Sequence, residues 1–256
     1  MSGLVSSHLP TRSIQLPLFS ETTDDVDFFV RESARARSLS IKIHADGQVE
    51  VVAPRRTSPY EVQTFVTRHR DWIAKTSAEL KSRFPKQDRS LPERIDLAAL
   101  RESWPVEYET SPGRPWRARE RGTCLSLCGD NSRPAGAYDQ LRRWLARRAR
   151  RHLVPRLQEL SAETGLVYES TQIRGQRTRW GSYSSSGTVS LNYCLLFLAP
   201  EIVRYLLIHE LCHTAHMNHS KRYWKLVERH ESDYRVLDRR LTDAWVDVPG
   251  WVFAEK

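Results

Sequence analysis

The feature that most constrains this 256-residue chain is the segment His209-Glu210-Leu211-Cys212-His213, which follows a long apolar run. Pro200 suits the first position of a helix, where its missing N–H costs nothing. Apolar residues then recur at helical spacing, at Ile202, Val203, Leu206 and Leu207. Two histidines four residues apart share one helical face and can bind one metal ion. Glu210 lies about 100° round the helix, where it can take a proton from metal-bound water without displacing that water.

The environment of this motif matters, because H-E-x-x-H fixes only three positions and occurs by chance in unrelated chains. Here two histidines and a glutamate follow an apolar run, where unpaired polar groups are costly. His219 comes six residues after His213. The pattern therefore indicates a metal site rather than a chance match.

His216 and His219 compete to be the third ligand. His216 shares the face of the first two histidines, but seven residues along a straight helix is a rise of ~10.5 Å. Three ligands in a row suit a tetrahedral site poorly. If the helix ends near Met217 and Asn218, with Asn218 in a left-handed conformation, His219 can turn back over the metal. We therefore favour His219 and expect His216 beside the site or at the surface.

Four spaced segments resemble those of the YgjP-like metallopeptidases, relatives of the WLM and SprT-like zincins. They are residues 174–182, 189–192, 209–213 and 218–224, within a strong similarity over about 165–240. The arginine-rich strand segment around Leu39 and the helix before Trp72 also fit the family's amino-terminal part. One departure stands out, because this chain has Tyr183 where the family usually has a cysteine after Trp-Gly-Ser.

The resemblance implies an α+β, zincin-like fold, with small antiparallel sheets, an H-E-x-x-H active-site helix and further helices. It implies one Zn²⁺ on His209, His213 and His219, with Glu210 as the general base of a metallopeptidase. In zincins a sheet edge strand runs past the metal and pairs with extended substrate backbone. The hairpin expected over residues 180–192 is our candidate for that strand.

Candidate substrate-binding residues precede this helix: Arg174, Arg177, Arg179 and Tyr183. Three arginines beside a divalent metal would also suit phosphates, so a nucleotide phosphohydrolase of the nucleoside triphosphate pyrophosphatase type is an alternative. A SprT-like protease acting near DNA is a further one. A metzincin is excluded because the only methionines are Met1 and Met217, which leaves no downstream Met-turn.

The expected elements are as follows. Strands are expected at 26–31, 94–97, 106–109 and 124–127, with another from about Val167, and hairpins at 39–53 and 180–192. A capping box at Ser58 begins a helix that ends before Pro85. A long helix spans 137–164, with a kink at Pro155. Further helices begin after Ser220 and near Asp233.

We expect three regions: a flexible tail at 1–25, a β-rich part with one long helix at 26–134, and the hydrolase part at 135–256. The last two are expected to pack as one unit.

The chain carries a net charge of +9, which favours polyanionic partners such as nucleic acid without identifying one. An arginine-rich face from Arg142 to Arg151 is the candidate surface, and a merely solvated face is the alternative.

The four cysteines do not suggest a disulfide scaffold. Cys124 and Cys128 can face each other across a turn or hold a metal, and Cys194 and Cys212 are expected in the core. No membrane span or secretory signal is expected, so we expect a reduced, cytoplasmic protein.

Overall fold

The computed structural model describes residues 26–34, 36–43, 49–83 and 89–254. Within-chain contacts divide the chain into two units, Met1–Pro85 and Lys86–Lys256. The expected tail at 1–25 and residues 44–48 of the hairpin expected at 39–53 lie outside the described residues. The division differs from the 134/135 boundary expected from sequence, because residues 94–129 share a hydrophobic core with the chain that follows them.

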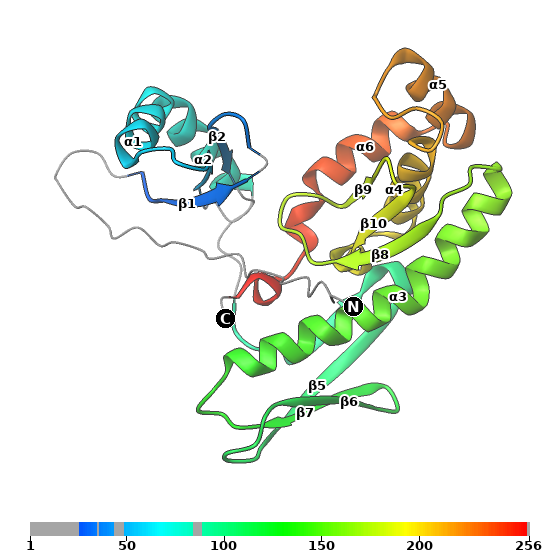
Figure 1. Cartoon of the computed structure of the whole chain (residues 1–256). Helices are drawn as coiled ribbons and strands as arrows, with labels where there is room; N and C mark the ends of the chain where they lie inside the picture. The colour runs from blue at the N-terminus through cyan, green and yellow to red at the C-terminus, as the bar shows by residue number, and fades with distance from the viewer. Residues whose placement is uncertain (1–25, 35, 44–48, 84–88, 255–256) are drawn as a thin grey trace, which may run out of the picture. The chain divides into compact units, whose positions relative to one another are not determined.

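The first unit is a small sheet accompanied by two helices (Figure 1). Its strands β1 (Phe28–Ser33), β2 (Ser40–Ile43) and β3 (Val49–Pro54) lie in the order β1-β3-β2. The expected hairpin is confirmed, because β2 and β3 are antiparallel. Apolar residues of β3 are buried against residues of the helices: Val49, Val51, Ala53, Val62, Val66 and Ile73.

The helical part of this unit consists of α1 (Pro59–Arg68) and α2 (Arg70–Arg83), where one long helix was expected. The Ser58 capping box is confirmed: Ser58 Oγ accepts from the N–H of Glu61, and the Glu61 carboxylate accepts from the N–H of Ser58. The break falls at His69, whose N–H bonds to the carbonyl three residues back and whose Nδ1 lies 2.8 Å from the Phe65 carbonyl. A side chain that takes part in the backbone bonding competes with the helix at that point.

The second unit contains a four-stranded sheet and a three-stranded sheet, both in contact with one long helix. The four-stranded sheet has the order β4-β5-β7-β6, with β4 (Arg94–Leu97), β5 (Glu102–Thr110), β6 (Arg117–Arg121) and β7 (Cys124–Gly129). The three-stranded sheet has the order β8-β10-β9, with β8 (Ser170–Arg174), β9 (Gly181–Tyr183) and β10 (Thr188–Asn192). Strand β6 was missed because its Arg-Ala-Arg-Glu-Arg sequence lacks the apolar alternation of a strand.

The sheets are mixed, so the expectation of antiparallel sheets was wrong in part. In each sheet, one strand precedes a hairpin in the chain, and the second strand of the hairpin lies parallel to that preceding strand. The parallel pairs are β1 with β3, β5 with β7, and β8 with β10. Turn residues predict a hairpin from local sequence. They say nothing about which hairpin strand lies beside an earlier strand.

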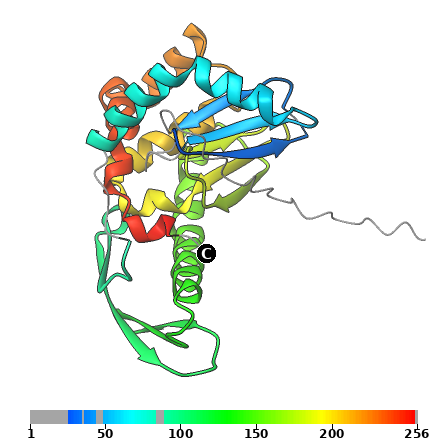
Figure 2. The same ribbon diagram turned by 90° about the vertical axis from the view of Figure 1, so that its left-hand side faces the viewer.

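Helix α3 (Ala135–Thr164) links these two sheets. It contacts β6 and β7 of one sheet and β8 of the other, and Figures 1 and 2 show β5–β7 beside its first half. Its apolar stripe is buried, including Leu141, Trp144 and Leu153. The helix continues through Pro155 and ends at Gly165, which has φ +72°. No helix among the described residues is long and apolar enough to cross a membrane.

The remaining helices are α4 (Pro200–Cys212), α5 (Lys221–His230) and α6 (Tyr234–Asp243). Short 3₁₀ turns lie at Ala98–Leu100, Tyr193–Phe197, Ala244–Asp247 and Gly250–Phe253. Helix α4 is covered by α5, α6 and β9, which explains why most of its residues are buried.

Candidate metal centre

Helix α4 carries the H-E-x-x-H motif at its end. Pro200 is at the first helical position, as expected. The helix ends at Cys212, five residues before the end expected near Met217. Among the described residues, positive φ occurs outside glycine only at Arg56 and Arg101, so the expected left-handed Asn218 was wrong. The chain turns directly after the helix, where the Thr214 N–H bonds to the Leu211 carbonyl.

This early turn brings together His209, His213 and His219. One ring nitrogen from each lies within 4.8 Å of the others, and the Nε2 atoms of His209 and His219 are 3.2 Å apart. His216 is not part of this cluster. Its backbone carbonyl instead lies 3.0 Å from His213 Nδ1. A carbonyl can only accept, so His213 Nδ1 carries the hydrogen and Nε2 is left with its lone pair.

Two tyrosines and an aspartate hold His209 from outside the cluster. The Tyr205 hydroxyl donates to Asp238 Oδ1 at 2.7 Å, which leaves its oxygen free to accept from His209 Nδ1 at 3.4 Å. The Tyr223 hydroxyl donates to the His209 backbone carbonyl at 3.1 Å. Such outer partners fix the tautomer and orientation of a metal-binding imidazole.

Aromatic rings fix the other two imidazoles. The His213 ring stacks on Tyr223, with centroids 4.6 Å apart and an angle of 24°. The His219 ring stacks on Trp224 at 5.5 Å and 30°, and Trp224 stacks in turn on Tyr234. Sequence reasoning missed these supports. Tyr205 has a sequence signal, since it lies one helical turn before His209, whereas Asp238 lies on another helix.

Glu210 is nearly buried beside the histidines, at 4% exposure, and its Oε2 has no hydrogen-bond partner among the described residues. Burial raises the pKa of Glu210 to about 8, and the charge of Arg179 opposes that rise. Gly181 of β9 makes room for this carboxylate: a Cβ at that position would come within 2.6 Å of Glu210 Oε1. Glycine at position 181 therefore permits the close approach of β9 to Glu210.

The donor set fits a zinc ion. Zn–N bonds of about 2.0–2.1 Å in a tetrahedron place two ligand nitrogens ~3.4 Å apart, close to the 3.2 Å between His209 and His219. Burial, with the neighbouring His213 and His219, lowers the pKa of His209 to about 3, so this ring is neutral and able to ligate at pH 7. The orphaned Glu210 oxygen indicates a missing polar neighbour.

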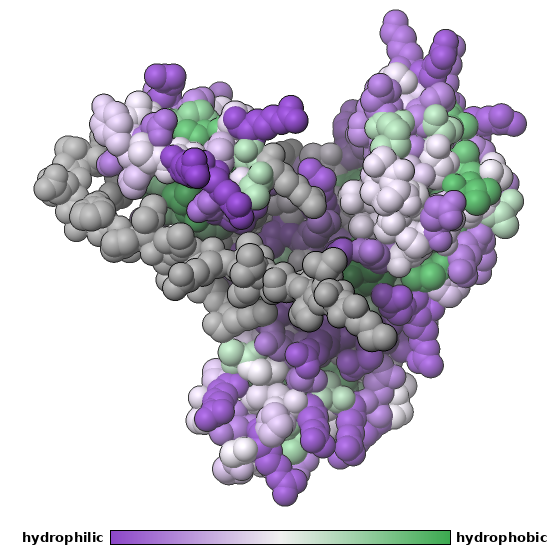
Figure 3. Space-filling view, in the orientation of Figure 1, coloured by the Kyte–Doolittle hydropathy of each residue, from purple (hydrophilic) through white to green (hydrophobic). Residues whose placement is uncertain are grey.

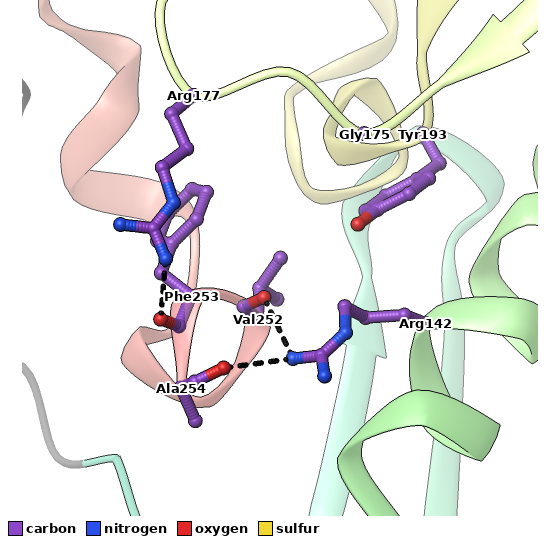
Figure 4. Close-up of a pocket in the computed structure, with 7 residues that line it drawn as sticks. All are labelled: Arg142, Gly175, Arg177, Tyr193, Val252, Phe253 and Ala254. Carbon is purple, nitrogen blue, oxygen red and sulfur yellow. Dashed lines mark hydrogen bonds between the residues drawn. The ribbon is translucent and has the colours of Figure 1, made fainter. Parts of the chain in front are cut away.

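The three arginines at 174–179 have different partners and do not converge on one site. Arg174 donates to Gln172 of its own strand, and Arg177 donates to the Phe253 carbonyl at 3.0 Å with its guanidinium over that ring. Figure 4 shows Arg177 at a separate pocket of about 320 Å³, opposite Arg142. Arg179 is exposed and is the one whose charge acts on Glu210.

The rest of this segment supports the site from behind. Trp180 is buried, stacks on Trp245 at 3.9 Å and donates to the Leu241 carbonyl. Its indole therefore packs beneath the segment. Tyr183 lies half-buried at the end of β9, opposite Val189 of β10. Buried Asn192, which sequence reasoning did not single out, donates to the Gln176 and Arg179 carbonyls and so fixes the approach to β9.

The cysteines lie apart from this site. Cys124 and Cys128 occupy one strand, β7, so they do not face each other across a turn. Cys194 and Cys212 are buried in the core, as predicted, and all four are free.

Comparison with known proteins shows the family to which the chain belongs. The matching family model is that of the YgjP-like metallopeptidase domain, over residues 37–244. This covers most of the chain, which therefore belongs to the YgjP-like metallopeptidase family. No curated protein matches the chain.

Two archaeal metallopeptidase zymogens of known structure are similar to part of the chain. Pyrococcus abyssi abylysin is 27% identical over 35% of this chain and 91% of its own, with a TM-score of 0.31. Methanocaldococcus jannaschii jannalysin is 17% identical over 35% of this chain and 92% of its own, with a TM-score of 0.32.

Proposed function

We propose that this chain is a zinc-dependent peptidase in which His209, His213 and His219 hold one Zn²⁺ and Glu210 is the general base. The observation that carries the proposal is the buried Glu210 oxygen, which has no partner among the described residues and lies between His209 and His213 of the histidine cluster in sequence. A structural metal site has no need of a base. Membership of a metallopeptidase family supports a peptide as the substrate.

When bound, a zinc ion on three neutral imidazoles would act as a Lewis acid and bring the pKa of a bound water to ~7. Glu210 accepts a proton from the attacking water and returns it to the leaving amine. Burial raises its pKa and makes the carboxylate a stronger base than an exposed glutamate, and the positive charge of a bound ion would favour the ionised form that accepts the proton. Tyr205 and Tyr223 keep His209 in place during this exchange.

Strand β9 is the proposed binding edge for the peptide. It lies at the edge of the β8-β10-β9 sheet and pairs with β10 on one side. Extended peptides add to such edges through backbone hydrogen bonds. Since Gly181 of β9 lies against Glu210, a peptide paired there would pass close to the base. Arg179, two residues before this strand, and Tyr183, at its end, are the side chains proposed to contact the peptide.

The phosphohydrolase alternative receives less support. It needs several arginines directed at one anion, whereas Arg174 and Arg177 bond to Gln172 and to the Phe253 carbonyl. Arg179 alone remains for phosphate. No contact among the described residues specifically favours a SprT-like protease over the peptidase proposed here.

The test is Glu210→Gln, compared with Glu201→Gln on the same helix. Glu201 is exposed and accepts from Arg240. We expect Glu210→Gln to lose about 10²–10⁴-fold in peptide hydrolysis with its zinc content unchanged, and Glu201→Gln to retain both. Cleavage of an unfolded protein and release of phosphate from a nucleoside triphosphate are measured in parallel, with zinc by elemental analysis. Loss of zinc together with activity would make Glu210 a ligand, and nucleotide turnover alone would favour the phosphohydrolase.

A further inference from the structure

Helix α3 carries six arginines within ten residues, and two of them are structural. The guanidinium of Arg142 donates to the carbonyls of Val252 and Ala254 (Figure 4), and it also pairs with Asp139. It therefore ties the C-terminal turn to α3 and is not part of an open face. The arginine-rich face expected from sequence thus contains residues with different roles.

Arg148 is the second structural arginine and is buried. It pairs with Glu102 of β5, lies 3.8 Å from Glu120 of β6, and places its guanidinium 4.8 Å from the centre of the Trp104 ring. Its charge is thereby compensated inside the second unit. Two acidic side chains near α3 are occupied by this one cation.

The remaining four arginines are exposed and form what we call the arginine stripe: Arg143, Arg147, Arg150 and Arg151. At about 100° per residue they fall within roughly 100° of the helix circumference. No ion pair or hydrogen bond joins their side chains to any residue that the structure describes. Figure 3 shows many hydrophilic side chains over the β5–β7 region, which lies beside the first half of α3.

The stripe is unfavourable for the helix by itself. Arg147 has like-charged neighbours at three positions three or four residues away, and each such pair destabilises a helix by ~0.2–0.5 kcal/mol. A face that needs only solvation can intersperse acidic residues and avoid this cost. Arginines without acidic neighbours along one helix face are instead suited to binding a negatively charged partner.

A hollow of about 330 Å³ opens within the stripe, lined by Glu120, Arg147, Arg148 and Arg151. Arg147 and Arg151 lie four residues, ~6 Å, apart along the helix and can both reach an anion at the mouth of this hollow. Glu120 is turned to internal partners, since it accepts from the Trp144 indole at 2.8 Å. The buried Nε2 of His152, in the next position along α3, has no hydrogen-bond partner among the described residues.

We propose that the arginine stripe of α3 binds the phosphodiester backbone of a nucleic acid. Guanidinium groups match phosphate oxygens in geometry as well as charge. An acidic protein is the competing partner, but protein interfaces depend on buried aromatic or apolar anchors. None of the exposed large hydrophobic residues that the structure describes lies on α3. Phosphate contacts need only the cations, and the inference does not depend on the proposed hydrolysis.

The experiment measures binding of the full chain to a fluorescein-labelled single-stranded DNA, and to the same sequence as a duplex, over a range of NaCl concentrations. The stripe variant is R143Q/R147Q/R150Q/R151Q. The control variant, R114Q/K225Q/R229Q/R239Q, removes the same number of charges from exposed positions elsewhere. Circular dichroism and thermal unfolding check that both variants are folded, and R143K/R147K/R150K/R151K restores the charge without the guanidinium.

We expect the slope of log K against log[NaCl] to be less steep by about 3 in the stripe variant, and affinity near 0.1 M salt to fall on the order of a hundredfold. The control variant should keep most of the wild-type slope, and the lysine variant should recover most of it. Equal losses in the stripe and control variants would overturn the proposal, since net charge alone would then explain binding. No salt-dependent binding by wild type, or equal affinity for polyglutamate, would also overturn it.

Discussion

The histidine face of α4 and the arginine stripe of α3 have the same spacing in sequence and opposite surroundings in the structure. Both place one ionisable residue type at i and i+4 on one helix. The imidazoles of His209 and His213 contact a hydroxyl, a backbone carbonyl and an aromatic ring, whereas the stripe arginines have no hydrogen-bond or ion-pair partner among the described residues. Helical spacing therefore explains why side chains of one type lie on the same face of a helix. The neighbouring residues determine whether those side chains are held in one orientation or remain available to bind another molecule.

The comparison is sharpest inside α3, between Arg148 and its neighbour Arg147. We expect Arg148→Ala to lower the free energy of unfolding by about 2–3 kcal/mol, because it removes charge-assisted hydrogen bonding to Glu102 and leaves two half-buried carboxylates without their cation. Arg147→Ala should not lower it, because Arg147 is exposed and has like-charged neighbours on α3. Chemical denaturation with a fluorescence readout measures both. Similar values for the two variants would show that Arg148 is as solvated as the stripe.

The polar support of His209 is tested next by Tyr205→Phe, which keeps the ring and removes the hydroxyl. We expect zinc affinity to fall about 10–100-fold, as when outer partners of metal ligands are removed. The matched control is Tyr234→Phe, whose hydroxyl accepts from Arg235 and not from a site histidine. Competition with a chromophoric chelator measures affinity without reference to activity. If the losses of zinc affinity caused by Tyr205→Phe and Asp238→Asn added up in the double variant, the two side chains would not act together on His209.

The burial of His209 should make the free energy of unfolding depend on pH, which the exposed arginines should not do. Burial lowers the pKa of His209 to about 3, while an unfolded histidine titrates near ~6.5. Between those values only the unfolded chain binds this proton. Stability of the metal-free protein is therefore complete above pH ~6.5 and is lost as pH falls below it, by about 1 kcal/mol at pH ~5.5. Urea denaturation at the two pH values measures the loss, and His209→Asn should reduce it. An unchanged loss in that variant would assign it to other groups.

Local signals predicted much of the fold and the candidate site. The Ser58 capping box, Pro200 at the start of α4, Gly165 after α3 and the H-E-x-x-H spacing depend on residues a few positions apart. Nonlocal features were not predictable in this way. The parallel strand pairs, Asp238 beside Tyr205, and the pairing of Arg148 with Glu102 join distant parts of the chain.

His219 lies beside His209 and His213, as the sequence argument expected, but for a different local reason. The sequence argument needed a helix ending near Met217 and a left-handed Asn218. The helix instead ends at Cys212, and His219 reaches the cluster through the turn that follows. The number of residues after His213 allowed the return, but propensities alone did not locate the helix end.

The smallest expected effect concerns the stripe itself. Arg147→Gln removes one cation from three like-charge neighbours on α3, so we expect the protein to become more stable by about 0.5 kcal/mol at low salt. The gain should shrink at high salt, where screening weakens repulsion between exposed charges. Thermal unfolding at two NaCl concentrations measures it, with Arg156→Gln as the control, because Arg156 pairs with Glu159 and its loss should not stabilise. If Arg147→Gln destabilised the protein at both salt concentrations, Arg147 would have a partner within the fold. The contrast between the histidine face of α4 and the arginine stripe of α3 would then not hold for this residue.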